Sequence, residues 1–128
     1  MDIEDVPMAL REIRRVLRAT GTLIISIVHP LAYRGRFAGP EADAAFVVQG
    51  SYFGRKRFEV VDERNGLQMH FAGWSQPVEN YMAALESAGF VVSALREPIP
   101  TVTAAFTHLE QWTRIPLFLW LKARHLVL

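Results

Sequence analysis

The sequence predicts an α/β fold for this chain of 128 residues. Helical and strand-like patterns alternate along most of its length, and two helical patterns end near a glycine, Gly21 or Gly89, that is followed at once by a short apolar run. Alternation of this kind is typical of proteins in which helices cover a sheet. The length fits a single domain, residues 1–128.

The first helix is expected over residues 6–19. Asp5 is a favourable N-cap residue, and Pro7 falls in the first turn, where a missing N–H is tolerated. Apolar residues then recur at helical spacing, with arginines on the other face. Gly21 is expected to end the helix in the left-handed conformation that glycine favours.

Residues 22–28 form a short, nearly continuous apolar run that is rich in β-branched residues. Such a run predicts a strand that is covered on both faces, as in an α/β sheet. No helix-linked strand precedes it in the sequence, so one of its edges is expected to lack a partner. Because natural proteins cover long apolar edges, we expect either preceding strands or a second copy of the chain, in a homodimer, to pair there.

Residues 31–74 interrupt the regular pattern with six glycines and many aromatic residues. Asn65-Gly66 is a favourable hairpin turn between apolar stretches at 57–61 and 67–71. We interpret this region as loops with a β-hairpin, inserted beside the main sheet as a cover for the substrate.

Regular patterning returns after residue 74. Ser75 or Gln76 is placed to cap a helix that carries Pro77 in its first turn and ends at Gly89. The later elements are expected as a strand at 90–95, a short helix at 107–113 with a capping box of Thr107 and Glu110, and a last strand at 117–123.

Charge and composition exclude several classes of function. The 14 basic and 13 acidic residues give a net charge of +1, which provides no reason to expect a nucleic-acid partner. The chain has no cysteine, so disulfides and thiolate chemistry are excluded. Its longest apolar run, residues 115–121, is far shorter than the ~20 residues of a membrane helix, and its acidic start is unlike a signal peptide. We expect a cytoplasmic protein without a membrane partner.

Three segments resemble class I, Rossmann-like methyltransferases of the type 11 group, which depend on S-adenosyl-L-methionine (SAM). Residues 5–30 resemble the helix and fifth strand of that family, with Ala19-Thr20-Gly21 in place of its usual proline-glycine-glycine. Residues 81–90 resemble the last main helix and its alanine-glycine-phenylalanine exit into the sixth strand. Residues 114–124 resemble the seventh, antiparallel strand. The resemblance runs in order over nearly the whole chain and implies the C-terminal half of a methyltransferase domain.

The resemblance implies a partial sheet made of strands five to seven, in which the strand at 117–123 lies between the other two and runs antiparallel to both. It also implies SAM-dependent methyl transfer to a small-molecule acceptor. The family's glycine-rich cofactor loop is not found here, because no G-x-G-x-G or G-x-G-x-x-G pattern occurs. We therefore expect this fragment to lack most of the SAM pocket and to be inactive by itself.

By the resemblance, the active site faces the start of the chain and the loop after the strand at 22–28. Met1 and Asp2 are expected to contact the cofactor there. His29 is the candidate catalytic base, because an imidazole titrates near neutral pH. The alternative is that His29 only ends the strand, with its ring bonded to the backbone.

The insert supplies the candidate substrate-binding residues Tyr33, Tyr52, His70 and Trp74. The alternative is that its aromatic residues pack among themselves and that His70 is an exposed hairpin residue. No metal site is expected, because no histidines have the spacing of metal ligands on one helix.

Two other functions are compatible with the sequence. One is a non-catalytic remnant of the methyltransferase fold that survives as a dimer through its strand edge. The other is an unrelated α+β module that binds a small ligand under the aromatic insert. The order of the strands separates this last reading from the methyltransferase fold.

Overall fold

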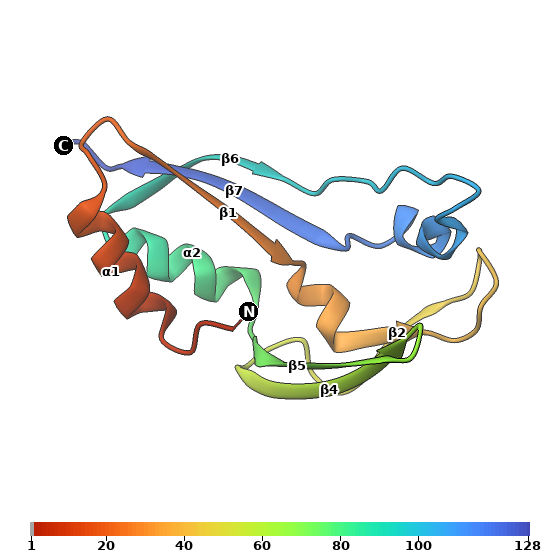
Figure 1. The fold of residues 1–128 in the computed structure, drawn as a ribbon. Coiled ribbons are helices and arrows are strands. Elements are labelled where there is room, and N and C mark those ends of the chain that lie inside the picture. The colour runs from red at the N-terminus through yellow and green to blue at the C-terminus, as the bar shows by residue number, and fades with distance from the viewer. Residues whose placement is uncertain (1) are drawn as a thin grey trace.

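A three-stranded sheet with two helices on one face forms the centre of the molecule (Figure 1). The computed structural model describes residues 2–128, and its main sheet has the order β1-β7-β6. These strands are β1 (Thr22–Val28), β7 (Phe118–His125) and β6 (Phe90–Arg96). β7 runs antiparallel to both neighbours. The predicted strand order and the antiparallel last strand are therefore confirmed.

The core lies between this sheet and the two helices α1 (Val6–Val16) and α2 (Val78–Ser87). α1 contributes Val6 and Leu10, and α2 contributes Tyr81 and Leu85. The remaining fully buried core residues come from the sheet and from the middle of α2: Ile27, Ala84, Phe90, Leu119, Leu121 and Ala123. In the described part of the chain, no helix has the length and apolar character that a membrane span requires.

The opposite face of the sheet is open, which corrects the expectation that the strand at 22–28 is covered on both faces. Ile24 of β1 is 64% exposed, and Trp120 of β7 is 47% exposed. Both point away from the helices, since neighbouring residues on these strands belong to the core. Along its other edge β1 has no strand partner among residues 2–128.

The caps of α1 agree only in part with the sequence pattern. The Asp5 carboxylate accepts a hydrogen bond from the backbone N–H of Met8 at 2.7 Å, as expected of an N-cap. The helix ends at Val16 and not at residue 19, because Leu17 is already extended with φ −72° and ψ 130°. Gly21 does not adopt the left-handed conformation that was expected. It is required for another reason: a Cβ there would lie 2.6 Å from Cγ of Leu17.

α2 begins at Val78 with Pro77 as its N-cap, and no side chain of Ser75 or Gln76 caps it, contrary to expectation. Instead the hydroxyl of Tyr52, distant in sequence, accepts a hydrogen bond from the backbone N–H of Val78 at 3.0 Å. After α2, Gly89 adopts a left-handed φ of +80°, as the sequence predicts.

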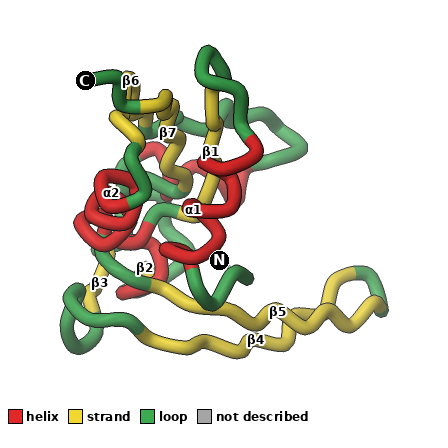
Figure 2. Tube along the Cα trace, turned by 90° about the vertical axis from the view of Figure 1, so that its left-hand side faces the viewer, coloured by secondary structure: helices red, strands yellow, loops and turns green. Residues whose placement is uncertain are grey.

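The insert contains more structure than the single hairpin that was expected. A 3₁₀ helix, η1 (Pro30–Arg34), leads into a small ribbon of β2 (Gly35–Phe37) and β3 (Phe46–Val48). The expected hairpin follows as β4 (Lys56–Arg64) and β5 (Leu67–Ser75) and projects from the body of the molecule (Figure 2). Its turn residues Asn65 and Gly66 have φ values of 52° and +77°, which confirms the predicted turn.

The second 3₁₀ helix, η2 (Thr107–Thr113), lies against the β2–β3 ribbon. Its N-cap residue is Phe106, and no side chain caps it, so the predicted capping box of Thr107 and Glu110 does not form. Side-chain donors hold it instead: the Gln111 amide donates to the carbonyl of Gly39 at 2.6 Å. Trp112 packs edge-on against Phe37, with ring centroids 5.0 Å apart.

Candidate functional site

The carboxyl ends of β1 and β6 lie at the same end of the sheet, because both strands run antiparallel to β7. Open α/β sheets bind ligands beyond the carboxyl ends of their strands. η1 follows β1 at this end, and the β4–β5 hairpin and the start of the chain approach it from below (Figure 1). This end of the sheet is therefore the candidate functional site.

His29 joins the two strand ends. It directly follows β1, is only 7% exposed, and its Nε2 lies 2.9 Å from Oε1 of Glu97, the residue after β6. Its Nδ1 accepts a hydrogen bond from the backbone N–H of Leu31 at 3.1 Å. Since Nδ1 is an acceptor, a neutral ring carries its proton on Nε2 and donates it to Glu97.

This geometry leaves His29 with no unoccupied ring nitrogen. Nδ1 accepts a hydrogen bond from the backbone of η1, and Nε2 contacts the carboxylate of Glu97, whose side chain is 51% exposed. A base needs a free lone pair within reach of the proton it removes. The arrangement thus supports the alternative role for His29, which is to end β1 with its ring bonded to the backbone, and adds a contact to Glu97 that the sequence did not predict.

Asp2 and Tyr33, expected near the cofactor and the substrate, line one cavity of about 510 Å³. Phe58 of β4 also lines it and stacks on Tyr33, with ring centroids 4.7 Å apart and an interplanar angle of 25°. Burial and the nearby negative charge of Asp2 raise the pKa of the Tyr33 phenol above its usual value of 10.0. Met1, the other expected cofactor contact, lies outside the described residues.

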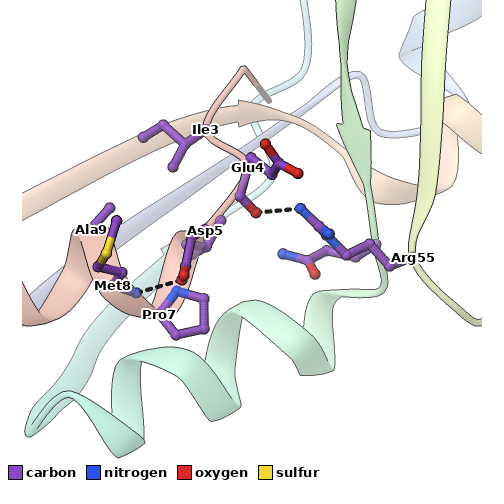
Figure 3. Close-up of a pocket in the computed structure, with 9 residues that line it drawn as sticks. Ile3, Glu4, Asp5, Pro7, Met8, Ala9 and Arg55 are labelled. Carbon is purple, nitrogen blue, oxygen red and sulfur yellow. Dashed lines mark hydrogen bonds between the residues drawn. The ribbon is translucent and has the colours of Figure 1, made fainter.

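A larger cavity of about 840 Å³ opens between the start of the chain and the hairpin (Figure 3). Residues 3–9 form most of its wall, and Arg55 and Gln76 complete it. Arg55, the residue before β4, donates a hydrogen bond to the backbone carbonyl of Glu4, which ties the start of the hairpin to the segment before α1. The carboxylate of Asp5 is already engaged as the helix cap.

The other expected substrate residues are scattered. Tyr52 uses its hydroxyl to bind the start of α2. The Trp74 ring is covered by the guanidinium of Arg55 at 3.9 Å from its centroid. His70 is exposed on β5, opposite Val61. The structure therefore brings together Asp2 and Tyr33 but places Tyr52, His70 and Trp74 elsewhere.

Sequence reasoning missed a third cavity, of about 310 Å³, which lies beside the Tyr33–Phe58 pair. Its wall includes Arg34, a side chain that is only 4% exposed. The only signal in the sequence is the position of Arg34 shortly after the strand end at His29-Pro30. Its burial depends on packing of η1 against β5, which the sequence pattern does not reveal.

Within residues 2–128, no three acidic or histidine side chains come together as ligands for a metal ion.

Solved structures show which known fold this arrangement matches. An S-adenosylmethionine-dependent methyltransferase from Mesorhizobium loti matches 96% of this chain with a TM-score of 0.68 and 23% sequence identity. A protein from Listeria monocytogenes assigned as an S-adenosylmethionine-dependent methyltransferase matches 97% of it with a TM-score of 0.68 and 18% identity. The chain has the fold of part of such a methyltransferase.

The structural match covers nearly all of this chain but only part of each methyltransferase. This chain spans 56% of the length of each of the two proteins, so it corresponds to little more than half of either one. No family model matches the sequence, and no curated protein matches it. The predicted resemblance is confirmed for the fold, and the reading as an unrelated α+β module is contradicted.

Proposed function

We propose that this chain forms the acceptor side of a SAM-dependent methyltransferase that acts on a small molecule. The observation that carries the proposal is the fold match over 96–97% of the chain. Three of the cavities support it, because they are lined by the start of the chain, by η1 and by residues of or next to the hairpin, near the carboxyl end of β1, and this class of sheet binds its ligands at such ends. One of them joins the start of the chain to the insert.

The described residues fit only one side of the cofactor. When bound, SAM supplies an electrophilic methyl group on a positively charged sulfur. The cavity of about 840 Å³ is large enough for part of such a ligand, but one of its carboxylates, Asp5, caps α1. The 128 residues contain neither the G-x-G-x-G nor the G-x-G-x-x-G pattern of the cofactor loop. Cofactor binding is therefore assigned to this chain together with further residues, and Asp2 remains the proposed contact.

The proposed task of this chain is to hold the acceptor. Methyl transfer from a sulfonium needs little covalent help, and placing the attacking atom in line with the methyl group is most of the work. Tyr33 and Phe58 stack on each other and line two cavities. An acceptor lying against this stacked pair would be oriented with few mobile contacts.

A fusion protein tests the proposal. Residues 2–128 replace the matching part of the Mesorhizobium loti methyltransferase, and formation of demethylated cofactor is measured over a panel of small acceptors. We expect turnover with some members of the panel. A folded fusion that binds the cofactor and methylates nothing in a broad panel would contradict the proposal.

The same assay separates the two roles of His29. If His29 holds Glu97 and is not a base, His29→Gln lowers turnover by less than about tenfold, because general bases contribute about 10²–10⁴-fold. The pH–rate profile should keep its shape, and His108→Gln, an exposed histidine in η2, serves as the control. A loss of more than about a hundredfold, together with a lost limb of the profile near neutral pH, would restore the base role.

A dimerising, non-catalytic remnant is the second candidate. The observation that favours it is the open sheet face, on which Ile24 and Trp120 are 64% and 47% exposed. In that case a second copy of the chain covers the face, whereas in the first candidate further residues of the methyltransferase do so.

A further inference from the structure

Arg34 is a buried cation whose charge has no acidic partner in the described part of the chain. Its side chain is only 4% exposed, and its Nη2 donates to the backbone carbonyls of Gly54 at 2.6 Å and Ser75 at 3.2 Å. These two contacts are to neutral oxygens. Among residues 2–128, none of the ion pairs involves Arg34.

Two further nitrogens of the same guanidinium, Nε and Nη1, are buried without any hydrogen-bond partner in the described chain. Buried polar groups are nearly always hydrogen-bonded, and a buried charge is strongly unfavourable unless an opposite charge compensates it. A guanidinium donates charge-assisted hydrogen bonds to the oxygens of an anion, and because Nη2 of Arg34 already donates to two carbonyls, such an oxygen would bind at Nε or Nη1. Arg34 therefore lacks what a bound anion would supply.

The cavity of about 310 Å³ beside Arg34 has the charge that such an anion needs. Three more basic side chains line it, Arg36, Lys56 and Arg57, and no acidic side chain does. Lys56 donates a hydrogen bond to the carbonyl of Ser51, at 3.4 Å. Arg57 has a loose contact of 3.7 Å with Glu59, and both of these side chains are largely exposed.

The walls of this cavity indicate the rest of the ligand. Tyr33 and Phe58 line both this cavity and the neighbouring one of about 510 Å³, in which Val60, Val61 and Phe71 add apolar surface. A ligand that fills both has an anionic group at Arg34 and an apolar or aromatic body against the Tyr33–Phe58 stack. The hairpin strand β4 supplies residues to both cavities.

We propose that this basic cavity binds the carboxylate of a small aromatic or apolar carboxylic acid, which serves as the methyl acceptor. That the ligand is an acceptor rests on the proposed function. That the cavity binds an anion does not, because it follows from Arg34 and its neighbours alone.

Calorimetric titrations of the purified chain, without SAM, test the proposal with three probes: benzoate, its neutral analogue benzamide, and inorganic phosphate. We expect benzoate to bind at one site per chain and benzamide at least about tenfold more weakly, since a hydrogen bond to a charged group contributes about that much. Equal affinity for benzoate and benzamide, or no binding of either, would overturn the proposal. Tighter binding of phosphate than of benzoate would overturn the carboxylate assignment.

Variants locate the site. Arg34→Gln should weaken benzoate about tenfold or more, and Lys56→Gln, at an exposed position that leaves the Arg34 contacts intact, about threefold. Arg18→Gln removes the same charge from an exposed position in the loop after α1 and should leave benzoate affinity unchanged. If Arg34→Gln fails to fold, the comparison of Lys56→Gln with Arg18→Gln still shows whether benzoate binds in this cavity. Equal benzoate affinity in those two variants would contradict the cavity as the site.

Benzoate binding and turnover by the fusion test the two proposals separately. Benzoate binding by the chain, together with a fusion that methylates no acceptor, would contradict the proposed function alone. A fusion that methylates only neutral acceptors, with no benzoate binding, would contradict this inference alone.

Discussion

His125 lies at the end of β7, is 7% exposed, and packs edge-on against Phe90 with ring centroids 5.8 Å apart. Its Nε2 lies 3.5 Å from Nη1 of Arg14 on α1. Burial, and then the positive charge of Arg14, lower the pKa of His125 below the ordinary 6.5. The ring is therefore held neutral where the sheet meets α1.

This lowered pKa predicts a pH dependence of stability. As the pH falls below about 6.5, the unfolded chain binds a proton at His125 that the folded chain does not, so the free energy of unfolding decreases until the pH reaches the folded pKa. Urea unfolding at pH 7.5 and pH 5.5 measures this. We expect wild type to lose more stability between these conditions than His125→Gln does, and His108→Gln to behave as wild type. Identical pH dependence in wild type and His125→Gln would refute the assignment.

Residues whose role is local were predictable from sequence, and residues whose role depends on distant contacts were not. Asp5 caps α1 and Asn65-Gly66 forms the hairpin turn because each acts within a few residues of itself. Tyr52 and Arg34 act across 26 and 41 residues, on Val78 and Ser75. No spacing in the sequence marks either contact.

At the scale of elements, the main helices and strands were predictable because each carries its own apolar period. The order of the three sheet strands was predictable only through the family resemblance, since periodicity does not choose strand partners. The sequence pattern did not predict η1 or the β2–β3 ribbon, whose strands have three residues each. Such short pieces contain too few alternations to show a period, and contacts from Gln111 and Trp112 of η2 hold the ribbon in place.

The open face of the main sheet was not predicted from the sequence either. This face leads to a prediction about self-association of the chain. A continuous apolar run shows that both faces of a strand are apolar. It does not show whether elements of the same chain or a separate partner cover the second face. Because Ile24 and Trp120 leave an apolar face on a sheet with free edges, we expect the purified chain to associate as its concentration rises.

Ile24→Lys should weaken this association by roughly tenfold or more, because a charge would have to be buried in the contact. Val16→Lys, at a position 67% exposed on α1, is the matched control. Light scattering over a concentration series gives the mass of both variants and of wild type. A constant monomer mass for wild type, or equal shifts for the two variants, would show that this face is not where copies meet.

At the scale of the whole molecule, the chain is one α/β unit, and the end that we propose as the functional site carries three cavities. The fold could be predicted because the order of its elements resembles that of the methyltransferase fold, which the solved structures share. The site could be predicted only in outline: Asp2, His29 and Tyr33 lie at the expected end of the sheet, but the basic cavity around Arg34 does not appear in the sequence pattern. A carboxylate acceptor bound there would be next to the cavity that Asp2 lines, because Tyr33 and Phe58 line both cavities.

We infer that these residues complete the site of a SAM-dependent methyltransferase. Calorimetric titration with the demethylated cofactor, S-adenosylhomocysteine, tests it most directly, on the chain alone and on the fusion with the Mesorhizobium loti protein. We predict no detectable binding by the chain alone at millimolar ligand, and saturable binding near one site per chain by the fusion. A folded fusion that does not bind this ligand, although the parent methyltransferase does, would contradict the account.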